Sequence, residues 1–263
     1  METGSLPLPA PSKAAMACGL RFGARGTHSS RTMMLAELSA LLSALPATAT
    51  RADYAKAIAE DNLLGKPTTA TRILTNQRLG ELYGLDPGLP LFRVLRRVWA
   101  VDEPGRPLIA LLASLARDPL LRAASTYILP LAEGEELVRT SFLAVLRAAV
   151  GERMNDSILD KVARNTASSW TQSGHLHGRV RKVRCRAQPT PGAVAFALWL
   201  GAVEGKAGED LTTTLWAAAL DRPPHRLLDL TLQASRLGLV KARIGGGVTA
   251  IDVSALDPGP GGI

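Results

Sequence analysis

The stretch RPLIALLASLARDPLLRAASTYIL, residues 106–129, decides the fold class of this chain. It is dense in Leu and Ala, which are two of the strongest helix formers. Asp118-Pro119 interrupts it, and a proline cannot continue a helix that has already begun. The stretch therefore predicts two buried helices that meet at Asp118-Pro119.

The composition extends this prediction to the whole chain. Hydrophobic residues make up 46% of the 263 residues, but aromatic residues only 4%. Strands favour β-branched and aromatic residues, so a large sheet is not expected. Phe92, Leu95 and Trp99 recur at helical spacing, as do Val138 and Phe142, which is typical of core positions. The predicted fold is mainly α, a multi-helix bundle with helix-turn-helix or winged-helix-like elements and short β-hairpins.

Four segments are expected along the chain. Residues 1–32 show no periodicity and contain Pro, Gly and Ser throughout, which predicts a disordered N-terminal tail. Residues 33–130 should form an N-terminal helical domain with a helix-turn-helix-like unit. Residues 131–255 should form a C-terminal helical domain with a basic strand and a winged-helix-like end. Residues 256–263 should be a loose tail.

The sequence also bears on the compartment. Cys18 and Cys185 are the only cysteines, too few for a disulfide framework, which favours a reducing environment. The longest apolar run, residues 193–203, is too short to span a bilayer. The first residues lack the charged start and long apolar region of a secretory signal. We therefore expect a cytoplasmic protein without a membrane partner.

The positive charge is concentrated in one part of the sequence. The formal net charge is +8, and residues 161–203 hold seven of the 31 Lys and Arg residues and none of the 23 Asp and Glu residues. Five of these cations lie within residues 179–186. A local basic patch is typical of proteins that bind a polyanion, most often nucleic acid, although a solvated basic face has the same composition. The candidate nucleic-acid-binding residues here are Arg179, Arg181, Lys182, Arg184, Arg186 and the nearby Gln172.

The order of elements before these cations resembles a winged helix-turn-helix. A helix should begin at Asp156 or Ser157 and run to about Arg164. Asn165-Thr166 then forms either a turn or the interior of a longer helix, and a second helical piece stops at Gly174. The basic strand follows, which places it where a wing would lie on a phosphate backbone.

A second candidate interface lies in the N-terminal half. A helix capped by Thr50 should run to about Leu64, and another should cover residues 68–78. We expect an inner face of Ala70, Ile73, Leu74 and Gln77, and an outer face of Thr68, Thr69, Arg72, Thr75 and Asn76. Such short or forked polar side chains suit base edges and phosphates. The candidate contact residues are Lys66, Arg72, Thr75, Asn76 and Arg78.

The C-terminal part repeats the helix, helix, hairpin order. Helices should begin at Thr190-Pro191 and Pro223-Pro224, and LVKARIGGGVTAIDVS, residues 239–254, predicts a hairpin with a tip at Gly245-Gly246-Gly247. No run of charge occurs here. The unit is therefore assigned to packing or to partner binding rather than to reading DNA.

A search of the sequence for catalytic chemistry finds no phosphate loop, dinucleotide fingerprint or nucleophile elbow. His175 and His177 form an HxH pair, but no further ligand cluster completes a metal site. Cys185 lies between two arginines and should have a lowered pKa, yet it lacks a base and an acid. The prediction is a protein without enzymatic activity, cofactor or metal.

Three segments resemble the BrxA family of small DNA-binding proteins from BREX phage-defence systems. They are YAKAIAEDNLLGKPTTATRILTNQRL, then LIALLASLARDPLLR, then the Trp-containing helix and basic strand at residues 170–186. The resemblance spans roughly residues 35–253 and rests on helical patterns rather than on a catalytic signature. It implies a helix-rich fold with helix-turn-helix and winged elements, binding of double-stranded DNA, and no enzymatic activity. It also implies other defence-system proteins as partners.

The resulting hypothesis is a non-enzymatic protein of phage defence that binds duplex DNA through the basic strand and the helix at residues 68–78. Two alternatives remain open. One is an RNA-binding, antitermination-like factor, which the low aromatic content disfavours because single-stranded RNA is usually bound by stacking. The other is a protein–protein adaptor whose basic strand faces an acidic protein surface.

Overall fold

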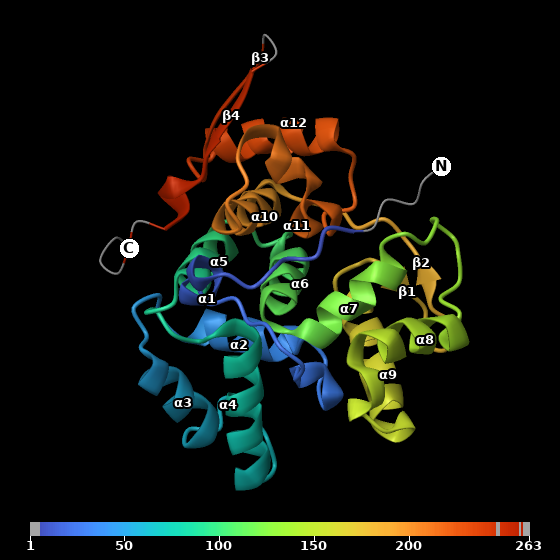
Figure 1. Cartoon of the computed structure of the whole chain (residues 1–263). Helices are drawn as coiled ribbons and strands as arrows, with labels where there is room; N and C mark the ends of the chain where they lie inside the picture. Colours follow the sequence, from blue (N-terminus) through green and yellow to red (C-terminus); the bar gives the residue numbers. More distant parts are fainter. Residues whose placement is uncertain (1–5, 246–247, 258, 260–263) are drawn as a thin grey trace.

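The computed structural model describes residues 6–245, 248–257 and 259 of the chain. It is mainly helical with two short antiparallel hairpins, as the composition predicts (Figure 1). The α-helices are α1 (Lys13–Ala17), α2 (Leu35–Ala44), α3 (Arg51–Ala59), α4 (Thr69–Tyr83), α5 (Pro90–Val101), α6 (Arg106–Arg117), α7 (Pro119–Ile128), α8 (Arg139–Val150), α9 (Asp156–Gln172), α10 (Pro191–Val203), α11 (Leu215–Ala218) and α12 (Pro224–Arg236). The strands are β1 (Leu176–His177), β2 (Val183–Arg184), β3 (Lys241–Gly245) and β4 (Val248–Asp252), and the 3-10 turns are η1 (Thr27–Ser29), η2 (Gly151–Arg153), η3 (Gly208–Thr213) and η4 (Ser254–Leu256).

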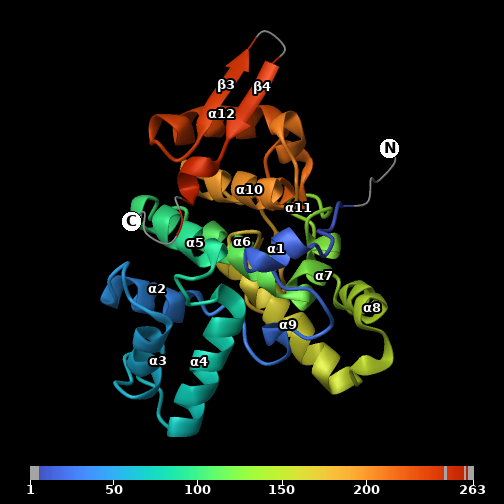
Figure 2. The same cartoon turned by 60° about the vertical axis from the view of Figure 1, so that its left-hand side comes forward.

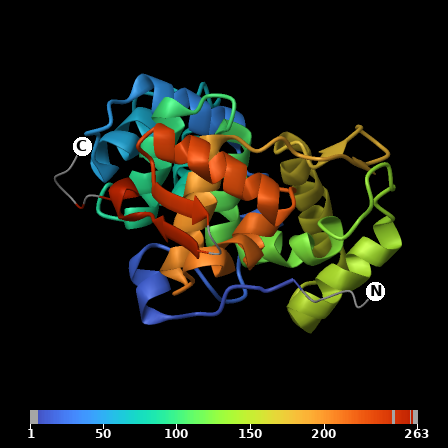
Figure 3. The same cartoon turned by 90° about the horizontal axis from the view of Figure 1, so that it is seen from above.

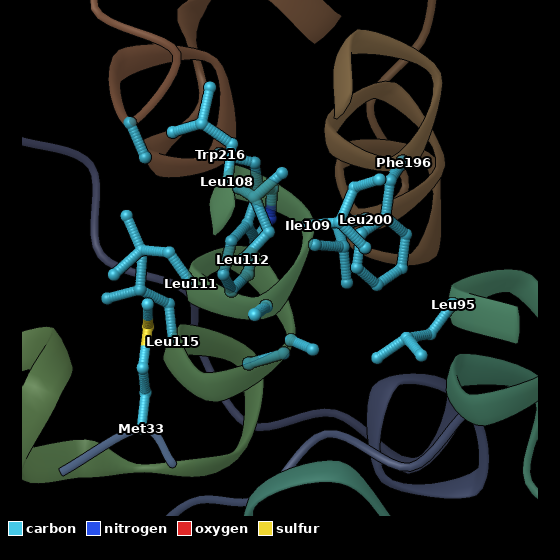
Figure 4. Close-up of a cluster of buried hydrophobic side chains, with 14 of the residues drawn as sticks. Met33, Leu95, Leu108, Ile109, Leu111, Leu112, Leu115, Phe196, Leu200 and Trp216 are labelled. Atoms are coloured by element: carbon cyan, nitrogen blue, oxygen red, sulfur yellow. The ribbon is translucent and has the colours of Figure 1, made fainter. Parts of the chain in front are cut away.

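Two helices, α6 and α10, form the centre of the molecule. Every residue from Leu108 to Ala116 is buried, as is every residue from Gly192 to Gly201. Both helices contribute side chains to the apolar cluster in Figure 4, where Phe196 and Leu200 lie beside Ile109. The break at Asp118-Pro119 is confirmed, because the Asp118 carboxylate caps α7 by accepting from the N–H groups of Leu120 and Leu121. None of the helices formed by described residues is long and apolar enough to cross a membrane.

The expected domain boundary near residue 130 does not divide the core. One cluster of buried hydrophobic residues extends from Ala15 to Leu256. The helix α10, from the expected C-terminal domain, packs against α5 and α6 from the expected N-terminal domain. An apolar helix buried on all sides needs partners all round it, and α5 and α6 from the other half of the sequence join α11 and α12 in covering α10.

The prediction of a disordered N-terminal tail is wrong for residues 6–32. Ala15, Leu20 and His28 are all buried, and the Arg21 N–H donates to the carbonyl of Ala116 at the end of α6. The Pro and Gly content prevents long helices here but does not prevent packing. The sparse apolar and hydrogen-bonding side chains of this segment are sufficient to hold it on the core.

The unit at residues 50–83 forms two helices, but the second is rotated from its expected orientation. Thr50 caps α3 as predicted, in a capping box with Asp53. The following helix continues to Tyr83, and its buried face is Thr75, Leu79, Leu82 and Tyr83. Ile73, expected to face inward, is 57% exposed, and Ala70 and Gln77 are exposed as well. The prediction stopped at residue 78 and so missed the large apolar residues that orient the helix.

The winged helix-turn-helix order expected at residues 156–186 does not form. A single 17-residue helix, α9, runs from Asp156 to Gln172, with Asn165-Thr166 in its interior. The strands that follow are two residues long, and they pair Leu176 with Arg184. Without a turn, α9 offers no separate second helix for a groove.

The C-terminal unit has the predicted order of helices and hairpin. Its hairpin pairs β3 with β4 in an antiparallel register from Lys241–Asp252 to Gly245–Val248. The expected glycine tip at residues 246–247 lies outside the described residues. The prediction of a loose tail from residue 256 is wrong for residues 256 and 257. Leu256 is buried, and Asp257 pairs with Arg93 at 2.7 Å. Residues 258 and 260–263 also lie outside the described residues.

Candidate nucleic-acid interface

The expected basic strand at residues 179–186 is a strand only at Val183–Arg184, and the whole segment, which we still call the basic strand, is tied to the rest of the chain by its own cations. Arg184 is fully buried and donates from Nη1 and Nη2 to the two carboxylate oxygens of Asp221, at 2.8 and 2.7 Å. Arg186 donates to the same carboxylate at 2.7 Å. The structure therefore contradicts a phosphate contact for Arg184, because solvent does not reach its guanidinium group.

An acidic segment, residues 133–136, lies alongside this strand. The Arg184 N–H donates to the Glu135 carbonyl at 2.8 Å, and the Leu137 N–H donates to the Lys182 carbonyl at 2.8 Å. Arg181 donates from Nε to Glu136 at 3.1 Å. The window is free of acids in the sequence, but in space it adjoins Glu133, Glu135 and Glu136. Its net positive field is weaker than the sequence indicates, because opposite charges at short range cancel.

The remaining candidates of this window differ in accessibility. Lys182 donates to Thr171 Oγ1 at 3.0 Å and to the Gly178 carbonyl at 2.8 Å, and partial burial lowers its pKa. Gln172 accepts a long 3.5 Å hydrogen bond from the Leu35 N–H. Arg179 is exposed and has no side-chain partner among the described residues. Arg179 and Arg181 thus stay accessible to an anion, whereas Lys182 is engaged within the fold.

Two expectations about nearby side chains change with the geometry. The pKa of Cys185 is raised rather than lowered, because burial outweighs the charge of Arg184. The HxH residues face different surroundings, since His175 is buried and His177 is exposed. His175 is held by Ser173 Oγ at 2.9 Å and by the Ala219 carbonyl at 3.0 Å. Burial lowers the pKa of His175 to about 4, so its ring is neutral at pH 7.

The candidates around α4 are mostly held by neighbouring groups. Thr75 is 1% exposed, which contradicts its placement on the outer face. Lys66 pairs with Glu37 at 2.9 Å, and Arg78 pairs with Glu81 at 2.7 Å. The same holds for the other two: Asn76 accepts from Arg51 at 3.0 Å, and Arg72 donates to Thr69 at 3.0 Å. These candidates do not form one exposed row on α4.

The C-terminal unit, by contrast, carries exposed cations on adjacent elements. The helix α12 buries Leu227, Thr231 and Ala234 and packs against α10 and β3. Its exposed residues include Arg226, Asp229, Gln233 and Arg236, spaced so that they share one side of the helix, and β3 adds exposed Lys241 and Arg243. In Figure 3 the orange α12 and the red hairpin face the viewer. This arrangement was missed because the cations are spread over 18 residues and form no run.

A buried Asp-His-Ser chain is the arrangement closest to a catalytic site. Asp118 Oδ2 lies 2.8 Å from His28 Nδ1, and His28 Nε2 lies 2.8 Å from Ser169 Oγ. All three residues are 0–1% exposed. Ser169 Oγ also accepts from the Met33 N–H at 2.8 Å and donates to the Asn165 carbonyl at 3.0 Å. The Ser169 hydroxyl is buried and all its hydrogen-bonding capacity is used, so a substrate cannot reach it. The Asp-His-Ser hydrogen-bond chain therefore has a structural role.

Comparison with protein-family models finds no match for this chain, and a search of curated proteins also finds none. The assignment of a site therefore rests on the geometry alone. The described residues define a mainly helical protein with exposed cations on the adjacent elements α12 and β3. We call Arg226, Gln233, Arg236, Lys241 and Arg243 the C-terminal basic surface.

Proposed function

We propose that this chain is a non-enzymatic protein that binds duplex DNA through the C-terminal basic surface. The observation that carries the proposal is the pairing of an exposed helix with an adjacent hairpin. Among the described residues, Arg226 is the only cation of this surface with a carboxylate partner, Asp229, at a loose 3.7 Å. The other cations are free to contact phosphates.

The dimensions of the two elements suit a duplex. A helix of 13 residues is about 20 Å long, and the major groove of B-DNA admits one helix. Arg and Gln side chains on such a helix form paired hydrogen bonds with guanine and adenine, respectively. The β3–β4 hairpin extends outward beside α12 (Figures 1 and 2), where Lys241 and Arg243 would lie on the adjacent backbone.

The resemblance to the BrxA family supports the same function from the sequence. It implies a role in a BREX-like phage-defence system, with other defence proteins as partners. The basic strand at residues 179–186 and the helix α4 become secondary candidates, because most of their cations already have partners within the fold.

The test is the binding of a labelled 30-base-pair duplex, measured by fluorescence anisotropy over a series of salt concentrations. The variant replaces Arg226, Arg236, Lys241 and Arg243 with Gln. We expect weaker binding and a log–log salt slope that is shallower by about one for each phosphate that the variant no longer neutralises. A control on the basic strand replaces Arg179 and Arg181 with Gln, and we expect it to bind nearly as tightly as the natural chain.

Each other outcome points to a different conclusion. Weaker binding by the Arg179 and Arg181 control alone would return the site to the basic strand. Stronger competition by duplex RNA than by duplex DNA would favour the RNA-binding alternative. If the natural chain bound neither nucleic acid, the proposal would be wrong and the adaptor alternative would lead.

A further inference from the structure

A polar cavity of about 430 Å³ lies between the N-terminal segment and the helices α4 and α6. Its lining includes Arg21, Arg25, Arg78 and Arg117, together with a single carboxylate, Glu81. Four arginines and one glutamate leave a formal excess of three positive charges. Three of the lining residues, Gln77, Arg78 and Glu81, belong to α4, which lies at the opposite end of the molecule from α12 and the hairpin (Figure 2).

Arg117 is a fixed cation at this cavity. Its guanidinium donates to the backbone carbonyls of Glu81 at 2.9 Å, Gly80 at 3.2 Å and Gly19. Burial, and then the charge of Arg21, lowers its pKa to about 10. It therefore remains charged at pH 7, and its hydrogen bonds within the described ranges all go to backbone carbonyls. A half-buried cation held by carbonyl dipoles favours an added anion.

The one carboxylate that lines the cavity already accepts hydrogen bonds from neighbouring side chains. Glu81 accepts from Arg78 at 2.7 Å and from Thr27 at 2.7 Å, and also from Gln77 at 3.1 Å. Burial raises its pKa, but these hydrogen bonds outweigh that effect, so the group is ionised. The Nε of Arg78 is buried without a partner in the part of the chain that the structure describes. Arg21 and Arg25 are exposed and make no side-chain hydrogen bond or ion pair to other described residues.

We infer that this cavity binds a phosphate compound carrying at least two negative charges. Arginine guanidinium groups match the geometry of phosphate oxygens through paired N–H donors. The volume is within the range of pockets that take small molecules. None of the described residues lining the cavity is aromatic, so nothing there stacks on a base. The site therefore recognises phosphate groups and not a particular base.

The test uses inorganic pyrophosphate as the probe, in isothermal titration calorimetry with the full chain at low salt. Replacing Arg21 and Arg25 with Gln should weaken binding at least tenfold. Both side chains are exposed, so this variant should fold. The control with the same change in net charge replaces the exposed Arg97 and Lys206 with Gln and should bind as the natural chain does. The variant Glu81→Gln, which removes the competing carboxylate, should bind several-fold more tightly.

The inference is wrong if the natural chain gives no binding at millimolar pyrophosphate, or if the control pair loses as much affinity as Arg21→Gln with Arg25→Gln. Adding a 30-base-pair duplex separates the two sources of phosphate. Displacement of pyrophosphate by the duplex would identify the occupant as the backbone of a nucleic acid. Unchanged pyrophosphate binding with duplex present would identify a free phosphate compound. The inference does not depend on the C-terminal basic surface, because the variants that test the cavity change none of the residues of that surface.

Discussion

Arg184 and Asp221 form a buried ion pair that fastens the basic strand to the loop between α11 and α12. Their side chains are 0% and 4% exposed. Asp221 also accepts from the Ala187 N–H at 2.9 Å, and its backbone adopts a left-handed φ of 60°. Burial alone would raise the pKa of Asp221. Hydrogen bonds from Arg184 and Arg186 outweigh this effect and lower the pKa below its usual value, so the carboxylate remains charged. The most basic segment of the sequence is thus anchored by one of its own cations.

The first prediction concerns this pair. Arg184→Met should destabilise the fold by about 3–5 kcal/mol, because it leaves the Asp221 carboxylate buried with a weaker partner. The measurement is the free energy of unfolding from urea titration monitored by circular dichroism. Arg181→Gln, a change at an exposed ion pair, is the control and should leave the unfolding midpoint unchanged. A small effect of Arg184→Met would mean that water reaches Asp221.

The second prediction concerns the N-terminal segment. A chain that begins at Met33 loses His28, whose ring Nδ1 lies 2.8 Å from the Asp118 carboxylate and whose N–H donates to it at 3.0 Å. We expect a loss of about 3 kcal/mol or more in stability, since the truncation removes the buried Ala15 and Leu20 and uncovers the apolar core beneath them. Thermal unfolding of this chain should be compared with that of a chain beginning at Ser12, since the described part of the deleted segment, residues 6–11, is mostly exposed. Identical midpoints would show that the segment does not contribute to the core.

The third prediction is a pH dependence due to His175. Its pKa is about 4 in the folded state and 6.5 in the reference state, so the unfolded chain binds the proton more tightly. The contribution of neutral His175 to the free energy of unfolding is therefore fully present above pH 6.5. It falls by about 3 kcal/mol in total as the pH decreases toward 4. His175→Gln should flatten this part of the stability profile in urea titrations. His225→Gln, at an exposed histidine, should leave the profile as it is.

The fourth prediction concerns the one acid on the exposed side of α12. Asp229 is 62% exposed, and its negative charge opposes a DNA phosphate at the proposed interface. Asp229→Asn should therefore strengthen binding of the 30-base-pair duplex several-fold at low salt, with less effect at high salt. Asp210→Asn, at an exposed position on η3, is the control. Weaker binding by Asp229→Asn would indicate that this carboxylate contacts a base instead.

The sequence predicted local features well where the residues involved are neighbours in the chain. The break at Asp118-Pro119, the Thr50 cap and the β3–β4 hairpin all depend on spacing over a few residues, and all three form. The predicted orientation of α4 was wrong, because Leu79, Leu82 and Tyr83 set the buried face and lie beyond the predicted end of the helix.

Long-range relationships could not be predicted from one sequence. The cations of residues 179–186 meet Glu136 and Asp221, which are 45 and 37 residues away from their partners Arg181 and Arg184. The His28 contact to Ser169 spans 141 residues. No pattern of period 2 or 3.6 reports such pairs, because periodicity describes only which face of an element is buried.

The central position of α10 has a consequence for synthesis on the ribosome. The helices α5 and α6 are made first, and the apolar surfaces that they present to α10 stay uncovered until residues 191–203 have emerged. At about 5–20 residues per second, the roughly 75 residues between the end of α6 and the start of α10 take several seconds to add. During that interval the nascent chain exposes surface that favours aggregation or chaperone binding. Completion of the core is therefore an event of the last third of translation.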